Sequence, residues 1–166
     1  MTSVVVPTRD AMQDLGARLA AMLLPGDLVV LSGGLGAGKT TLTRGIGRGL
    51  AVRGDITSPT FVIARVHPSL VGGPALVHVD AYRLGSLAEV DDLDLDTSLT
   101  SSVTVVEWGE DKVDGLSDDR LVVTLARPVG GDGVDDADEP RTVTLRGVGE
   151  RWSGVALGEL LDAAGA

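Results

Sequence analysis

The stretch Gly33-Gly34-Leu35-Gly36-Ala37-Gly38-Lys39-Thr40-Thr41 decides the fold, because it fits the phosphate-binding pattern G-x-x-x-x-G-K-[ST] from its first glycine to Thr40. Glycines let the backbone turn tightly enough for successive N–H groups to face phosphate oxygens. In this pattern the lysine, here Lys39, reaches the β- and γ-phosphates, and the hydroxyl of Thr40 ligates Mg²⁺. Residues 33–41 are therefore predicted to form a nucleotide-binding loop.

The segments on either side of this loop fit a strand–loop–helix unit. Residues 27–31 form a short apolar run after a Pro-Gly pair, as a buried parallel strand does. Downstream, an apolar residue recurs every four positions and predicts one helical stripe, made of Leu42, Ile46 and Leu50. The same segment contains the glycines Gly45, Gly47 and Gly49. Each weakens a helix by about 1 kcal/mol relative to alanine, so packing must hold this helix or the glycines allow another element to approach closely.

Composition limits the class of protein. A length of 166 residues is typical of one domain with a sizeable core, and we expect residues 1–166 to form a single domain. The absence of cysteine excludes disulfides and thiolate metal sites. A formal net charge of −10 argues against bare nucleic acid as the main ligand, because phosphate contacts require clustered Lys and Arg. No apolar run is long enough to span a bilayer and no signal peptide opens the chain, so we expect no membrane partner. The absence of cysteine fits a cytosolic protein.

The remaining pattern alternates between strands and helices. Thr8 is a candidate N-cap for a helix that a Pro-Gly pair ends after residue 23. Strands are predicted over 2–6, 61–66, 75–80, 103–107, 120–126 and 141–145, and short helices over 86–90 and 153–164. Residues 129–140 carry five acids and three glycines and predict a mobile acidic loop. The pattern indicates an α/β fold like that of P-loop NTPases, with a central, mostly parallel sheet, antiparallel additions and flanking helices.

Two carboxylates, Asp80 and Glu107, each follow an apolar strand directly. Open α/β sheets bind ligands beyond the carboxyl ends of their strands, so both acids are candidates for catalysis together with Lys39. Glu107 fits the role of the second metal residue, opposite Thr40, either as a Mg²⁺ ligand or as an acceptor from metal-bound water. The alternative is that each acid merely ends its strand at the solvent.

Three further features lie near these acids in the sequence. Thr57-Ser58-Pro59-Thr60 follows the helix after the loop, where hydroxyls sense a γ-phosphate, although a polar turn before a strand is an equal alternative. We interpret His78, inside an apolar strand, as a buried core histidine rather than a ligand. Trp108, directly after Glu107, either packs on the site or fills its rim.

Four motifs occur in an order that resembles one known family: Gly-x-Leu-Gly-Ala-Gly-Lys-Thr-Thr at 33–41, Thr-Ser-Pro-Thr-Phe at 57–61, His-x-Asp-x-Tyr-Arg-Leu at 78–84 and Val-Glu-Trp at 106–108. This combination is similar to the bacterial TsaE family, also called YjeE, over about residues 10–145. That family comprises small ATPases needed to make threonylcarbamoyladenosine in tRNAs that read ANN codons. The resemblance therefore implies a cytoplasmic ATPase that uses ATP and Mg²⁺.

The resemblance also assigns roles to residues and partners. It implies that Thr40 and Glu107 bind Mg²⁺, that Asp80 is needed for activity, and that Ser58, Pro59 and Thr60 belong to a switch-like loop beside the nucleotide. The implied partners are the proteins TsaD and TsaB, with tRNA reached indirectly through their complex. One departure is that Gly34 stands where the family usually has Asp, so any role of that carboxylate is absent.

Two alternatives stay open at this point. Asp111-Lys112-Val113-Asp114 superficially resembles the guanine-reading Asn-Lys-x-Asp of small GTPases, although Asp111 replaces the asparagine. The other alternative is a nucleotide-dependent assembly factor, in which bound ATP matters and hydrolysis is incidental. A comparison of ATP with GTP affinity separates the first alternative from an ATPase, and turnover in the presence of the partners separates the second.

Overall fold

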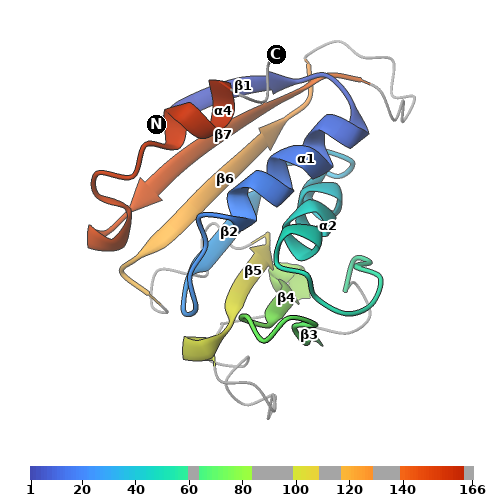
Figure 1. The fold of residues 1–166 in the computed structure, drawn as a ribbon. Coiled ribbons are helices and arrows are strands. Elements are labelled where there is room, and N and C mark those ends of the chain that lie inside the picture. The colour runs from blue at the N-terminus through green and yellow to red at the C-terminus, as the bar shows by residue number, and fades with distance from the viewer. Residues whose placement is uncertain (60–63, 84–98, 109–116, 129–138, 163–166) are drawn as a thin grey trace.

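A single mixed sheet forms the centre of the computed structural model, which describes residues 1–59, 64–83, 99–108, 117–128 and 139–162 (Figure 1). Its seven strands lie in the order β1-β7-β6-β2-β5-β4-β3. In chain order they are β1 (Thr2–Val6), β2 (Leu28–Ser32), β3 (Ala64–His67), β4 (Leu76–Asp80), β5 (Val103–Glu107), β6 (Arg120–Ala126) and β7 (Arg141–Val148).

The middle of this sheet is parallel and its edges are antiparallel. Strand β2 pairs in parallel with both β5 and β6, and β4 pairs in parallel with β5. Antiparallel pairs join β6 to β7, β7 to β1, and β4 to β3. The α/β fold expected from the sequence, with a mostly parallel centre and antiparallel additions, is therefore confirmed. Because β2, β4 and β5 run in the same direction, their carboxyl ends lie next to one another at the same end of the sheet.

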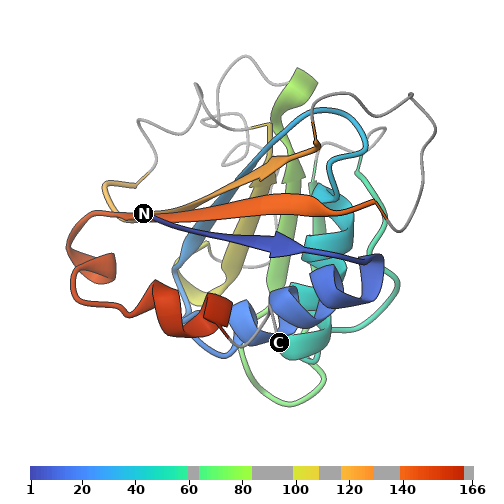
Figure 2. The same cartoon turned by 90° about the horizontal axis from the view of Figure 1, so that it is seen from above.

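In the described part of the chain, three α-helices cover one face of the sheet: α1 (Arg9–Ala20), α2 (Lys39–Gly49) and α4 (Leu157–Asp162) (Figure 2). Helix α1 begins where expected, since the Thr8 side chain accepts a hydrogen bond from the Ala11 N–H at 3.1 Å. The larger apolar cluster lies between these helices and the sheet, and a smaller cluster around Val30, Val79 and Val106 lies on the opposite face. Within the described ranges, no helix is long and apolar enough to cross a membrane.

The glycines of α2 allow α1 to approach closely. A Cβ atom at Gly45 would lie 2.1 Å from the carbonyl oxygen of Gln13, and one at Gly16 of α1 would lie 2.4 Å from that of Leu42. Both contacts are with backbone atoms, which cannot move aside as a flexible side chain can. Both of the sequence-based possibilities for this helix therefore hold, because close approach of α1 is the packing that stabilises α2.

Some expectations were wrong in extent or fall outside the described residues. The C-terminal helix begins at Leu157, four residues later than expected, because Gly154 has a φ of +79° that an α-helix does not accommodate. Short 3₁₀ turns that were not predicted occur at Ala81–Arg83, Leu99–Ser101 and Glu150–Trp152. The helix predicted at 86–90 and residues 129–138 of the acidic loop lie outside the described part of the chain.

Candidate nucleotide-binding site

The loop between β2 and α2 has the backbone that its glycines predict. Gly33, Gly36 and Gly38 have φ angles of 146°, 74° and 103°, which L side chains rarely adopt. At Gly33, space also forbids a side chain, since a Cβ would lie 2.4 Å from the Leu125 carbonyl oxygen. Helix α2 begins at Lys39, so its first N–H groups lie at the loop and favour an anion there.

Lys39 lies folded back over this loop. Its Nζ donates to the carbonyl oxygens of Gly33 at 2.7 Å and Gly34 at 2.9 Å, and lies 3.8 Å from the centre of the Trp108 ring. Burial lowers the pKa of Lys39 below its usual 10.5, while the carboxylates of Glu107 and Asp80 act in the opposite direction. The ammonium group therefore lies in a partly desolvated environment close to two carboxylates.

Glu107 connects the end of β5 to α2 and to β4. Its side chain is 4% exposed, and its Oε1 accepts a hydrogen bond from the Thr40 hydroxyl at 3.1 Å. The same oxygen lies 2.8 Å from Nε2 of His78, which donates to it because an ionised carboxylate can only accept. The structure thus brings Thr40 and Glu107, the two predicted metal residues, into direct contact.

Asp80 lies beside Glu107 because the two residues are register partners on the parallel strands β4 and β5. Its Oδ1 accepts a hydrogen bond from the Tyr82 N–H at 3.0 Å, which fixes the carboxylate at the strand end. Tyr82 in turn packs edge-on against Trp108, with ring centroids 5.7 Å apart. The two strand-end acids of the sequence analysis therefore lie together.

These groups share one cavity of about 560 Å³, a volume typical of small-molecule sites. Its lining includes the loop from Leu35 to Thr41, both acids, Trp108 and Tyr82. Of the predicted switch-like loop, Ser58 lines this cavity, whereas Thr57 lines a separate cavity beside Arg44. Pro59 is buried, and Thr60 lies outside the described residues.

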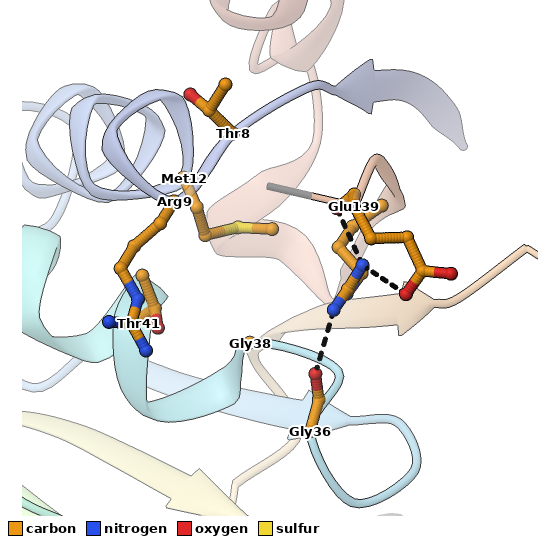
Figure 3. Close-up of a pocket in the computed structure, with 8 residues that line it drawn as sticks. Thr8, Arg9, Met12, Gly36, Gly38, Thr41 and Glu139 are labelled. Atoms are coloured by element: carbon orange, nitrogen blue, oxygen red, sulfur yellow. Dashed lines mark hydrogen bonds and ion pairs between the residues drawn. The ribbon is translucent and has the colours of Figure 1, made fainter. Parts of the chain in front are cut away.

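A smaller hollow lies on the α1 side of the same loop (Figure 3). Arg9, from the first turn of α1, extends toward Thr41, and also lines the larger cavity. On the other side of the hollow, Arg141 donates to the carboxylate of Glu139 at 2.8 Å and contacts the Gly36 carbonyl oxygen at 3.4 Å. Two arginine side chains, Arg9 and Arg141, thus line the hollow beside the glycine loop.

The donor set fits Mg²⁺. The hydroxyl of Thr40 and the carboxylates of Glu107 and Asp80 are all oxygen donors, which Mg²⁺ prefers. In the described parts of the chain, no group of three or more His, Cys, Asp or Glu side chains forms a closed metal cage. An open site of this kind suits Mg²⁺, which keeps several waters and binds through one or two protein oxygens together with nucleotide phosphates.

The family model described as "Threonylcarbamoyl adenosine biosynthesis protein TsaE" matches residues 6–130, and thus includes the loop, both acids and Trp108. The chain belongs to the TsaE family. The family was expected from four sequence motifs, and that expectation is confirmed.

Individual TsaE relatives are similar over most of their length. A TsaE protein of Streptomyces coelicolor is 66% identical over 143 residues, which cover 86% of this chain and 94% of the relative. One from Mycobacterium tuberculosis H37Rv is 55% identical over 120 residues, or 68% of this chain and 71% of the relative. A crystal structure of Bacillus subtilis YdiB superposes with a TM-score of 0.73 at 26% identity, covering 98% of this chain and 95% of that one.

Some residues at this TsaE site were not singled out from the sequence as part of it. Arg9 lines the cavity, but a single polar residue at this position gives no pattern. Tyr82, which was quoted only as a member of the motif at 78–84, lines the cavity as well. His78 was interpreted as a buried core histidine, and it is fully buried, yet its Nε2 bonds to Glu107. Two signals were available: His78 opens the motif at 78–84, and it lies two residues before Asp80, where alternate residues of a strand share a face.

Proposed function

We propose that this chain binds ATP with Mg²⁺, hydrolyses it, and thereby supports the biosynthesis of threonylcarbamoyladenosine in tRNA together with the proteins TsaD and TsaB. The observation that carries the proposal is the convergence of the glycine loop, Lys39, Thr40 and Glu107 on one cavity. Membership in the TsaE family supports the tRNA-modification context.

Each residue of the site has a separate role in this proposal. The backbone N–H groups of the loop and the first turn of α2 hold the phosphates. Lys39 breaks its hydrogen bonds to the Gly33 and Gly34 carbonyl oxygens and binds the β- and γ-phosphates instead. Thr40 and Glu107 would hold Mg²⁺, which when bound offsets the negative charge of the phosphates. Asp80, next to Glu107 and at the cavity wall, would orient the attacking water and accept its proton.

The acidity of the chain supports an indirect route to tRNA. A net charge of −10 disfavours direct contact with a phosphate backbone, whereas partner proteins can hold the tRNA. ATP turnover by this chain would then act on the complex with TsaD and TsaB rather than on the nucleic acid. In this proposal the protein is an energy-coupling subunit in the cytoplasm.

Hydrolysis of ATP by the purified protein, alone and with TsaD, TsaB and tRNA, tests the proposal. We expect Mg²⁺-dependent release of phosphate that increases with the partners, and tighter binding of ATP than of GTP. Glu107→Ala and Asp80→Ala should still bind nucleotide, since neither residue belongs to the phosphate loop, but should not sustain repeated cycles of modification.

Normal modification over many turnovers by both variants would contradict the ATPase role and would favour an assembly factor that only needs bound nucleotide. Stronger binding of GTP than of ATP would instead favour the GTPase alternative. The Asp111–Asp114 segment that motivates that alternative lies outside the described residues. The exposed Arg146→Ala serves as a variant control for both assays.

A further inference from the structure

Glu107 receives a hydrogen bond from inside the sheet as well as from the nucleotide loop. His78 lies in the middle of β4, is 0% exposed, and places Nε2 2.8 Å from Oε1 of Glu107. Strand β4 is next to β5 in the sheet, and Glu107 is the register partner of Asp80, two residues beyond His78. His78 therefore contacts the acid from a position that solvent and nucleotide do not reach.

The hydrogen-bond partners of His78 show which of its ring nitrogens is the donor. An ionised carboxylate has no proton to give, so Nε2 carries the hydrogen. Among the described residues, Nδ1 of His78 has no hydrogen-bond partner. The ring thus acts as a fixed donor aimed at Glu107.

The two donors together determine which oxygen of Glu107 is available. The Thr40 hydroxyl and His78 Nε2 both bond to Oε1, which uses the two lone pairs of that oxygen. The other oxygen, Oε2, then has the lone pairs that can bind a metal ion or its waters. One carboxylate rotamer is selected by contacts from two different elements, α2 and β4.

We propose that His78 is a positioning residue for the Mg²⁺ site: by donating to Oε1 it holds the Glu107 carboxylate in the orientation that receives the metal. This inference rests on the proposed binding of Mg²⁺ and ATP at the cavity. Groups that orient a metal ligand in this way commonly affect metal affinity by about 10- to 100-fold. A histidine that only fills the core would affect stability and leave the metal dependence of nucleotide binding unchanged.

The test measures the affinity for a non-hydrolysable ATP analogue by calorimetry, once with Mg²⁺ and once with EDTA. The dissociation constant in EDTA divided by the one with Mg²⁺ reports how much the metal strengthens nucleotide binding. In His78→Leu, which keeps an apolar core but removes the donor, we expect this ratio to fall about 10-fold or more. The affinity in EDTA should change little, because the phosphate loop does not contact His78.

Two further variants separate positioning from packing. His78→Gln carries an N–H donor near the position of the original Nε2 and should restore much of the ratio. His67→Leu is the matched control, since His67 is also buried but bonds to the Arg53 carbonyl oxygen rather than to a site residue. It should lower stability and leave the ratio at the wild-type value. If His78→Leu does not fold, His78→Phe replaces it.

Each outcome decides one question. An unchanged ratio in folded His78→Leu overturns the positioning role, and so does an equal loss of affinity with Mg²⁺ and with EDTA. In a Glu107→Ala background, removal of His78 should cause no further loss of the ratio. If the wild-type protein itself shows no gain from Mg²⁺, the proposed function fails, and that result is distinguishable because it does not depend on any His78 variant.

Discussion

The Thr40 hydroxyl donates a hydrogen bond to Oε1 of Glu107 at 3.1 Å and joins residues that are 67 positions apart in the chain. Thr40 lies in the first turn of α2, and Glu107 is the last residue of β5. Their contact follows from the parallel pairing of β5 with β2, because β2 leads directly into the loop before α2. The two oxygen donors proposed for Mg²⁺ are therefore held together by the protein itself.

Removal of this hydroxyl should affect metal-dependent binding selectively. In Thr40→Ala we expect the gain in nucleotide affinity from Mg²⁺ to fall at least about 10-fold, a loss of the size seen when metal-site contacts are removed. Thr40→Ser keeps the hydroxyl and should retain the gain. Titration of nucleotide with and without Mg²⁺ measures the effect, and equal gains in the two variants would contradict a role for Thr40 at the metal.

Lys39→Ala should weaken nucleotide binding both with and without Mg²⁺. The ammonium group contacts phosphate rather than metal in our proposal, and charged hydrogen bonds contribute about 1.5–3 kcal/mol, or about 10- to 100-fold in affinity. Arg146→Ala, at an exposed position of β7, controls for the simple loss of one positive charge. Unchanged affinity of Lys39→Ala in a calorimetric titration would count against the phosphate-binding loop.

Gly45→Ala should destabilise the fold, because its new Cβ would meet the Gln13 carbonyl oxygen at 2.1 Å and push α1 away from α2. Overpacking of this kind costs about 1–3 kcal/mol, which corresponds to about 2–12 °C in Tm for a chain of this size. Gly34→Ala is the matched control, since a Cβ at Gly34 meets nothing within 4 Å. Thermal unfolding of the two variants checks the prediction, which equal Tm values would contradict.

Local signals were sufficient for much of the fold and for the centre of the site. The loop at 33–41 and its flanking strand and helix follow from glycine conformations and from apolar spacing, which act within a few residues. Asp80 and Glu107 were predicted as site residues because each follows an apolar strand directly, and in the structure they are register partners. These inferences required only periodicity and the direction of strands.

Contacts between distant side chains could not be predicted in the same way. The bond between His78 and Glu107 depends on the register of β4 against β5, which no single strand specifies. The contact of Arg141 with the Gly36 carbonyl depends on where β7 lies relative to the loop. The late start of α4 depends on a left-handed glycine, Gly154, inside a segment whose composition otherwise suits a helix.

His67 should make the folded state sensitive to acid. Burial lowers its pKa below the usual 6.5, and its hydrogen bond to the Arg53 carbonyl oxygen only partly opposes this. At pH values above about 6.5 the ring is neutral in both states and adds no pH dependence. As the pH falls below that value, the unfolded chain binds a proton that the folded protein does not, so stability falls until the folded pKa is reached.

Urea unfolding of the wild-type protein and His67→Gln at pH 7.5 and pH 5.5 measures this effect. The free energy of unfolding should fall less in the variant, with a contribution from the histidine of at most about 1.4 kcal/mol per pH unit. The other titratable groups are common to the two proteins, so groups that do not interact with His67 cancel in the comparison. The same pH dependence in both proteins would show that His67 is protonated equally in its folded and unfolded states.

Trp108 should report nucleotide binding through its fluorescence, because Lys39 Nζ lies 3.8 Å from its ring centre and must leave that position to reach a phosphate. The second tryptophan, Trp152, is 5% exposed, packs against Arg151 and lies beside Gly147 of β7. We therefore expect ATP to change the emission of Trp152→Phe, in which Trp108 is the remaining fluorophore. Trp108→Phe should show no change, and a response of equal size in both variants would mean that the emission follows a rearrangement of the whole fold rather than the movement of Lys39.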